Sequence, residues 1–334
     1  MLQVREDVFQ YYFYFIQERM NMFWEKYHCQ HSPWTKDKIL RVHKFTNVYR
    51  ASDRVSQYLI RNVIYNENHS FTEEDTLLRI LVFKIFNKIE TWEYLETTLG
   101  IIKVSNFNLR QINNALLKRK EKYPIFSNAY MMTGTHSLYN HLNFKHEKWL
   151  EMVKIEMLQK GTFQKIIKAK SLEEVYFILR NCSFIGDFLA YQYAIDFNYS
   201  SVINFSEDSF VKAGIGAIRG IKKCFEPLGK NSFEDAIRYT QENFDVFQKK
   251  FGYSDFSNLF GRTPTLIDLQ NCFCETDKFL RVKMPELQVG NKKIKQKYKE
   301  TPKALNLFFP PKWDINSKIT EKCLQKNTKE LTLF

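Results

Sequence analysis

The 334-residue sequence predicts an all-α fold. Two observations lead to this prediction. Apolar residues return every three or four positions along most of the chain, which is the period of one helix face. Strict two-residue alternation, which is typical of a half-buried strand, is scarce. With 44% hydrophobic residues, the chain can bury a substantial core, as one large domain or as two packed helical lobes.

Each expected helix is defined by an apolar stripe. In chain order, these stripes lie at residues 9–23, 55–63, 77–89, 150–157, 171–179 and 188–195. Segments with turn-forming residues predict the loops, at 31–38, 66–71, 134–137, 227–232 and 261–264. Aromatic residues make up 16% of the chain, so most of them are expected in the core.

The two stripes at 171–195 predict a helix, a tight hairpin and a second helix. Ser171 is a good N-cap, and acidic residues follow it in the first turn. The first helix is expected to end near Asn181, and residues 182–186 then interrupt the helical period. We expect Gly186 to adopt a positive φ in this hairpin. The start of the second helix could then offer free amides to a DNA phosphate, although many buried helical pairs turn on a glycine without binding a ligand.

This segment resembles the helix-hairpin-helix DNA glycosylases, in which a catalytic aspartate follows the hairpin glycine by about two dozen residues. Asp208 lies 22 positions after Gly186 (208 minus 186). The resemblance implies that Asp208 is the catalytic carboxylate. The chain departs from the pattern at Phe184, which stands where the first hairpin glycine is usual. The alternative for Asp208 is an ordinary helix cap.

A second resemblance covers residues 10 to 285. It rests on five segments in the same order, SPWTKDKILRVHKFTNVYRASDRVSQYL, IFSNAYMM, FIGDFLAYQYAIDFNYS, DSFVKAGIGAIRGI and DLQNCFCETDKFLR. These resemble the alpha-glutamyl/putrescinyl thymine pyrophosphorylase family, also described as the helical domain associated with 5-hydroxymethyl-deoxyuridine DNA kinases.

The family resemblance implies a helical, glycosylase-like fold and an enzyme acting on hypermodified thymine in DNA. A kinase first places pyrophosphate on the 5-hydroxymethyl group of a uracil, and the family enzyme replaces it with an amine or amino acid. Such an enzyme needs no tightly bound cofactor, and a magnesium requirement stays open. No G-x-x-x-x-G-K-[ST] string occurs, so we expect a separate kinase to supply the substrate. A bacteriophage source fits this pathway.

Displacing pyrophosphate requires cationic groups that stabilise the leaving anion. The basic residues within the family-like segments are Arg219, Lys212, Arg50 and Arg54. Arg219 is the first candidate because Gly214 and Gly216 precede it in a turn that can begin a helix. The alternative is that these glycines allow close helix packing and that Arg219 pairs with an acid.

An acidic group must accept a proton from the attacking amine. The candidate catalytic residues are Asp208, Glu275, Asp277 and Lys278, and Asp53 lies beside Arg54. For Glu275, Asp277 and Lys278, and for Asp53 with Arg54, the alternative is an ion-pair network that holds two helices together. Chemistry on a base within a duplex requires its eversion, and Trp34, Asn47 and Gln192 are candidates to stack on or hydrogen-bond the base. A core position is the alternative for Trp34 and for Gln192.

The charge of the chain agrees with a DNA partner. The formal net charge is +13 and the pI is about 9.2, which favours encounters with polyanions. Residues 1–285 are expected to form the helical base-modifying domain, and 286–334 a basic C-terminal extension. Within that extension, Lys292, Lys293 and Lys295 are candidates for contacts to DNA phosphates; a solvated tail is the alternative.

The remaining features favour an intracellular protein, in the cytoplasm of a host cell if phage-encoded and in the nucleus if eukaryotic. Six irregularly spaced cysteines do not predict a disulfide framework, and no secretory leader is recognised. No metal site is predicted, since Cys272 and Cys274 are separated by one residue. No apolar run suggests a membrane span. Besides the transferase, two functions stay open: a glycosylase excising a modified pyrimidine, and a non-catalytic DNA-binding protein.

Overall fold

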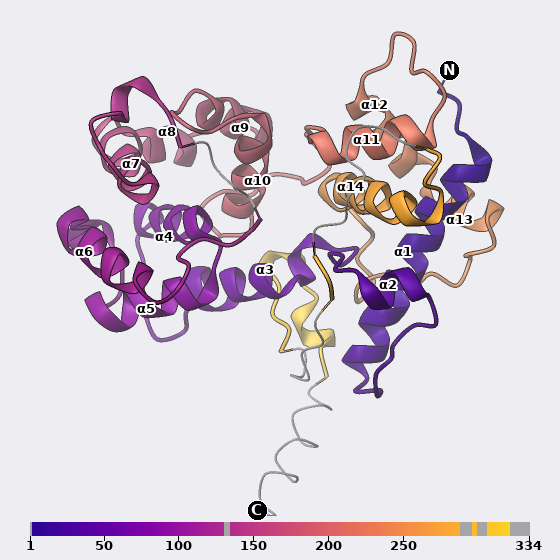
Figure 1. Cartoon of the computed structure of the whole chain (residues 1–334), viewed down its shortest axis with the longest axis horizontal. Coiled ribbons are helices and arrows are strands. Elements are labelled where there is room, and N and C mark those ends of the chain that lie inside the picture. Colours follow the sequence, from indigo (N-terminus) through magenta and orange to yellow (C-terminus); the bar gives the residue numbers. More distant parts are fainter. Residues whose placement is uncertain (1, 130–133, 288–295, 299–305, 321–334) are drawn as a thin grey trace, which may run out of the picture. The chain divides into compact units, whose positions relative to one another are not determined.

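The computed structural model describes residues 2–129, 134–287, 296–298 and 306–320. Across these ranges the chain forms fourteen α-helices and no strand, with only isolated β-bridges (Figure 1). The all-α prediction is therefore confirmed. The helices are α1 Glu6–Tyr27, α2 Lys38–Val42, α3 Arg54–Tyr58, α4 Glu73–Phe86, α5 Ile89–Leu99, α6 Leu109–Lys120, α7 Lys145–Met152, α8 Thr162–Ile167, α9 Leu172–Arg180, α10 Asp187–Asn198, α11 Ile215–Cys224, α12 Phe233–Glu242, α13 Phe244–Lys250 and α14 Leu266–Lys283.

The chain divides into two compact units. Unit 1 combines Met1–Asp53 with Val211–Phe334, and unit 2 is the continuous segment Arg54–Phe210. Unit 1 therefore takes its helices from both ends of the sequence, with α1 and α2 from the first segment and α11 to α14 from the second.

Unit 1 is built around α14, which contacts α1, α2, α11 and α12. The apolar stripe predicted at 9–23 lies on α1, and its Phe9 and Tyr12 are fully buried. Both rings stack with Phe273 of α14, at centroid distances of 6.4 and 4.3 Å. The high aromatic content thus serves mainly to fill this core.

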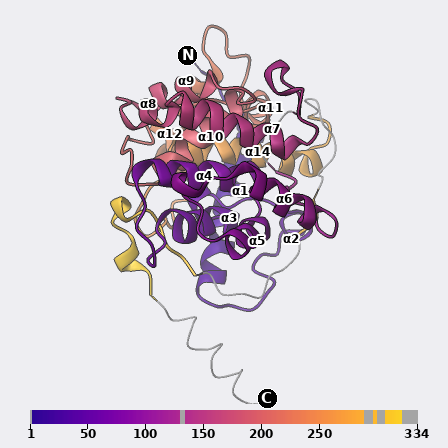
Figure 2. The same ribbon diagram turned by 90° about the vertical axis from the view of Figure 1, so that its left-hand side faces the viewer.

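Helices α11 and α14 lie side by side in both views (Figures 1 and 2). Their close approach depends on two glycines. A Cβ atom at Gly220 would lie 2.1 Å from the carbonyl oxygen of Phe273, and one at Gly216 would lie 2.2 Å from Cys274 Sγ. No side chain fits at either position without moving a neighbour.

The described part of the C-terminal segment packs on unit 1. Phe309 is fully buried, and the Arg262 guanidinium lies 3.8 Å from the ring centroid of Trp313. The Tyr27 hydroxyl of α1 donates to the Thr320 carbonyl. Residues 306–320 therefore cover one end of α1 and its neighbouring loops.

In unit 2, the apolar stripe at 77–89 does not form one helix, so that prediction was wrong at its end. Helix α4 begins with a capping box between Thr72 and Asp75 and ends at Phe86. Asn87 then takes a left-handed conformation with φ of 46°, and α5 begins at Ile89. The stripes at 55–63 and 150–157 each run from an α-helix into π-helical turns, at Leu59–Ile64 and Val153–Gln159.

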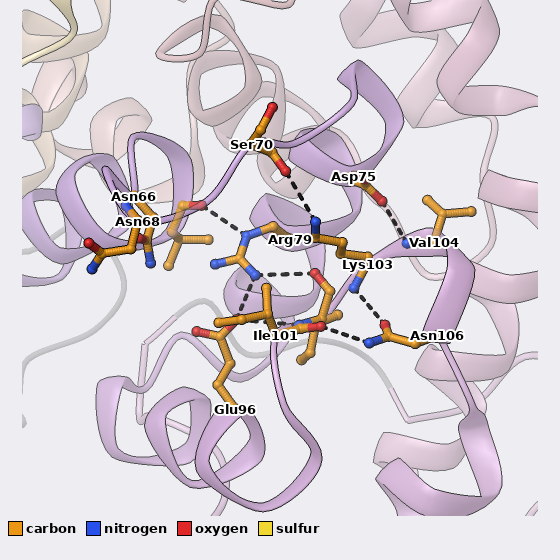
Figure 3. Close-up of polar contacts among 12 residues, drawn as sticks. Asn66, Asn68, Ser70, Asp75, Arg79, Glu96, Ile101, Lys103, Val104 and Asn106 are labelled. Carbon is orange, nitrogen blue, oxygen red and sulfur yellow. Dashed lines mark hydrogen bonds and ion pairs between the residues drawn. The ribbon is translucent and has the colours of Figure 1, made fainter.

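A buried arginine ties the helices of unit 2 together (Figure 3). Arg79 donates from Nε to the Val63 carbonyl (3.1 Å), and from Nη1 to Glu96 (2.5 Å) and to the Ile102 carbonyl (3.1 Å). Its guanidinium also lies 4.2 Å from the ring centroid of Phe71. Arg79 thus links α4 to the π-helical turn before it and to the segments around α5.

The predicted helix-hairpin-helix is present as α9, a hairpin at 181–186 and α10. Ser171 caps α9 by accepting a hydrogen bond from the Glu174 amide, and Asn181 is the C-cap. The positive φ is found at Phe184 (65°) and not at Gly186 (−81°), so the expectation for Gly186 was wrong. The Phe184 ring stacks on the Trp149 ring, with 5.0 Å between the ring centroids, and its centroid lies 5.3 Å from that of Tyr139. Burial of this ring holds the strained backbone in place.

Candidate functional site

Five residues predicted from the sequence meet within unit 1. Three of them, Asn47, Arg50 and Asp53, lie on the loop between α2 and α3, and Glu275 and Lys278 lie on α14. We call these five residues, together with Arg19, Thr46 and Asp268, the loop–α14 cluster. More than two hundred residues of chain separate its two halves.

The loop half of the cluster is ordered by its own polar groups. The Asn47 amide donates to Asp53 Oδ1 (2.9 Å), and Asn47 Nδ2 donates to the Ser52 carbonyl (3.0 Å). Arg19 of α1 donates from Nη2 to Asn47 Oδ1 (2.7 Å) and from Nε to the Thr46 carbonyl (3.1 Å). The Asn47 side chain is therefore oriented by an arginine on one side and by the backbone on the other.

The α14 half supplies carboxylates that hold the loop. Glu275 accepts a hydrogen bond from the Thr46 amide (3.2 Å) and pairs with Lys278 (2.5 Å). Asp268 accepts a hydrogen bond from the Arg50 amide (2.8 Å). The sulfur of Cys272 lies near the Val48 carbonyl, one helical turn from both acids. Asp268 and Glu275 are seven positions apart, so they lie on one face of α14.

Burial and like charge change the protonation of this cluster. The pKa of Asp53 is raised to about 7, first by desolvation and then by the charge of Glu275, against the opposing effects of the Asn47 amide, Arg19 and Arg50. Desolvation also raises the pKa of Asp268 and lowers that of Arg19. Asp53 is therefore a carboxyl group that exchanges its proton near neutral pH.

A second charged cluster lies between α11 and α14. Asp277, which is fully buried, pairs with Arg219 (3.3 Å) and Lys223 (3.0 Å) of α11 and with Arg281 of its own helix. One carboxylate is thus surrounded by three cations. Arg219 thus pairs with an acid, as expected if it does not bind phosphate.

The other predicted residues of unit 1 lie outside these two clusters. Lys212 pairs with Glu234 at 3.0 Å. Gly214 caps α11, and Gly216 allows the close contact with α14 described above. Trp34 is half-buried, donates to the Gln30 carbonyl (2.8 Å) and has the Lys26 ammonium over its ring.

Four predicted residues belong to unit 2. Arg54 is exposed at the start of α3, and Gly186 is the exposed N-cap of α10. Gln192 is fully buried within α10. Asp208 is exposed in a turn, where its amide donates to Ser206 Oγ (3.2 Å). The alternative that Asp208 caps a helix was wrong, because the next helix begins only at Ile215. Lys292, Lys293 and Lys295 lie outside the described residues.

Sequence reasoning missed two charged members of the loop–α14 cluster. Arg19 stands within the apolar stripe of α1, and a lone cation in such a stripe is a signal for a buried partner. Asp268 stands three residues after Thr265, and the two form a capping box at the start of α14. Either signal could have drawn attention to the residue, but neither identifies the loop as its partner.

Two kinds of feature are absent from the part of the chain that the structure describes, namely metal-binding clusters and membrane-spanning helices. There, no group of three or more His, Cys, Asp or Glu side chains is placed to hold a metal ion. None of the helices described has the length and apolar character that crossing a membrane requires. Cys182, Cys224, Cys272 and Cys274 are free thiols.

Comparison with known proteins gives a family match over most of the chain. Residues 6–289 match the family described as "5-hmdU DNA kinase, helical domain". The chain is 26% identical over 288 residues to a "5-hmdU DNA kinase" of Bacillus phage SP10, an alignment that covers 80% of this chain and 44% of that protein. The chain therefore spans less than half the length of this relative. No solved structure matches it.

Proposed function

Because the chain belongs to the family of 5-hmdU DNA kinase helical domains, we propose that it acts in the hypermodification of thymine in phage DNA. Its reaction replaces the pyrophosphate of 5-(pyrophosphoryloxymethyl)uracil in DNA with an amine or amino acid. The substrates are thus DNA carrying a modified thymine and a small amine. The phage relative supports this pathway through its name alone.

One observation carries the proposed reaction, namely the convergence of Asp53 and Glu275 with Arg19, Arg50 and Lys278 in one cluster. An amine that attacks the 5-methylene carbon must lose a proton, and the departing pyrophosphate must be stabilised by positive charge. The cluster contains a carboxyl group with a pKa of about 7 and cations beside it. Both requirements of the reaction are met by residues of one unit.

The proposed step is a substitution at carbon. A bond forms between the amine nitrogen and the 5-methylene carbon, while the bond from that carbon to the pyrophosphate oxygen breaks. The electron pair of the broken bond leaves with the pyrophosphate, and Asp53 accepts the proton of the nitrogen. Lys278 has a side chain that is 26% exposed and neutralises part of the charge on the leaving group.

The kinase step is assigned to a different region or protein. A P-loop sits between a strand and a helix, and the described residues contain no strand. The phage relative is more than twice as long as the part that this chain matches. We therefore place phosphorylation outside residues 6–289.

Product analysis tests the function. Duplexes containing thymine, 5-hydroxymethyluracil or its pyrophosphate ester are incubated with the protein and a mixture of amines, and the DNA is digested to nucleosides for mass analysis. We expect an aminated nucleoside from the pyrophosphate ester alone. Release of a free base with an abasic site would instead establish the glycosylase, and binding without any product would establish a non-catalytic DNA-binding protein.

A matched pair of variants tests the role of Asp53. Asp53→Asn retains an oxygen that can accept from the Asn47 amide but cannot take a proton, so we expect a loss of turnover of about 10² or more. Asp245→Asn, on the exposed first turn of α13, removes the same charge outside the cluster and is expected to retain turnover. Equal activities of the two variants would remove Asp53 from the mechanism.

A further inference from the structure

Ile215 is the most exposed large apolar side chain in the described part of the chain, at 71%. It is the first residue of α11 and stands between Gly214 and Gly216. The flanking positions carry no side chains, so the surroundings of Ile215 are open to a partner. The backbone beneath it is fixed, because Gly216 packs directly against Cys274.

The surface around Ile215 is cationic. On α11, Arg219 and Lys222 follow Ile215 by four and seven positions and therefore share its face. On α14, Lys278 follows Cys274 by four positions and therefore lies on the same helix face as Cys274, whose sulfur is the neighbour of Gly216. We call Ile215, Arg219, Lys222 and Lys278 the α11 face.

The charges around this face do not cancel. Six cations lie on or beside it, namely Lys212, Arg219, Lys222, Lys223, Lys278 and Arg281. Three carboxylates pair with them, from Glu234, Glu275 and Asp277, which leaves a net charge of +3. The side chains of Asp277, Lys223 and Arg281 are all buried, and the Glu275 side chain is only 7% exposed. The charges that reach solvent are therefore those of Lys212, Arg219, Lys222 and Lys278 against Glu234 alone, and they are mainly positive. A polyanion is the complementary partner.

We propose that the α11 face docks on duplex DNA and that Ile215 inserts as a wedge between neighbouring bases. Apolar side chains inserted in this way unstack a base step, and unstacking lowers the cost of everting the base that is to be modified. The cations beside Ile215 hold the phosphates on either side of the opened step. This inference rests on the proposed function for its choice of DNA as the partner.

A fluorescence experiment tests the wedge without chemistry. The probe is a duplex with 2-aminopurine next to a single 5-hydroxymethyluracil, because 2-aminopurine becomes brighter when unstacked. We expect the wild-type protein to raise its fluorescence and Ile215→Ala to lose most of that rise, while DNA affinity changes by less than about threefold. Val246→Ala removes a side chain of α13 that is 63% exposed and is expected to behave as wild type.

A second variant tests the docking. Lys222→Gln removes one cation from the α11 face and is expected to weaken binding to all duplexes alike, with a salt slope reduced by about one. An unchanged salt slope for Lys222→Gln would overturn the docking surface. A fluorescence rise that is the same in Ile215→Ala and wild type, or absent in both, would overturn the wedge.

Comparison of duplex and single-stranded substrates separates this inference from the proposed function. We expect Ile215→Ala to lower the rate of modification roughly tenfold on a duplex and hardly at all on a single strand, where no stack needs opening. Equal losses on both would overturn the wedge. If wild type forms no product on either but retains a fluorescence rise that depends on Ile215, the proposed reaction fails and the wedge stands.

Discussion

Asp53 is the residue at which burial and charge oppose each other most clearly. It accepts a hydrogen bond from the Asn47 amide and lies near two arginines, which favour the carboxylate. Desolvation and Glu275 favour the protonated form, and they prevail, since its pKa rises to about 7. The folded protein therefore holds a proton on Asp53 at pH values at which the unfolded chain has released it.

This difference predicts a pH-dependent stability. Between pH 4 and 7 the folded state binds more protons than the unfolded state, so the contribution of Asp53 is fully present at low pH and is lost as the pH rises through 7. Asp53→Asn has no such loss. We expect its stability relative to wild type to increase by on the order of 3 kcal/mol between pH 4.5 and 7.5, as measured by urea unfolding. A constant difference over this range would contradict the raised pKa.

Gly220 is a residue whose identity is set by packing alone. Its α-helical backbone would accept alanine, but the added Cβ would lie 2.1 Å from the Phe273 carbonyl oxygen, which is backbone and cannot turn away. We expect Gly220→Ala to destabilise the protein by about 1–3 kcal/mol through overpacking. Gly186→Ala is the control, because its Cβ would meet nothing within 4 Å and its φ is −81°. Denaturant midpoints of the two variants check the expectation, and equal midpoints would refute it.

At the scale of elements, the α9–α10 hairpin shows how a turn can be built without its usual glycine. Phe184 stands at the left-handed position, and its ring is packed among Trp149, Tyr139 and His136. Glu156 holds the same turn by accepting from the Ser183 amide (2.9 Å) and from the Tyr139 hydroxyl (2.6 Å). The hairpin is therefore fixed by the core beneath it rather than by its own backbone preference.

Two substitutions separate backbone strain from packing at this position. Phe184→Ala loses the ring and keeps the strained φ, so we expect a loss of about 3–5 kcal/mol. Phe184→Gly loses the ring but relieves the strain, and should be more stable than Phe184→Ala by about 1 kcal/mol. Thermal or urea unfolding measures both. An alanine variant more stable than the glycine variant would show that the positive φ costs nothing.

At the scale of the whole molecule, the two units differ in the number of chain segments that form them. Unit 2 is one continuous segment, whereas unit 1 joins residues 1–53 to residues after 210. The contact between α1 and α14 therefore joins segments that lie more than two hundred residues apart in the sequence. Closing so long a loop before native contacts form slows folding.

This topology predicts the order of folding. We expect the amides of α4, α9 and α10 in unit 2 to gain protection from hydrogen exchange before those of α1 and α14 in unit 1. Pulse-labelling during refolding from urea measures this order. Earlier protection of α1 would show that the ends of the chain meet before the middle folds.

Much of the local structure could be predicted from the sequence because its signals are short-range. Three correct predictions depend only on residues within a few positions of one another: the stripe on α1, the Ser171 cap and the end of α9 near Asn181. The two failures have different causes, one local and one tertiary. At Asn87 a left-handed residue ends the helix inside a continuous apolar stripe, and at the hairpin the tertiary packing of Phe184 overrides the preference of Gly186.

The sequence by itself determined that the chain is helical, that a hairpin joins α9 to α10, and that it resembles the helical domain of 5-hmdU DNA kinases, which the family match confirms. Only the tertiary structure decided which candidate residues meet. It brings Asn47 and Asp53 to Glu275 and pairs Arg219 with Asp277, while Asp208 lies in unit 2. Helical period and capping act over a few residues, whereas these contacts join segments far apart in sequence and depend on how α14 packs against α1, α11 and the loop before α3.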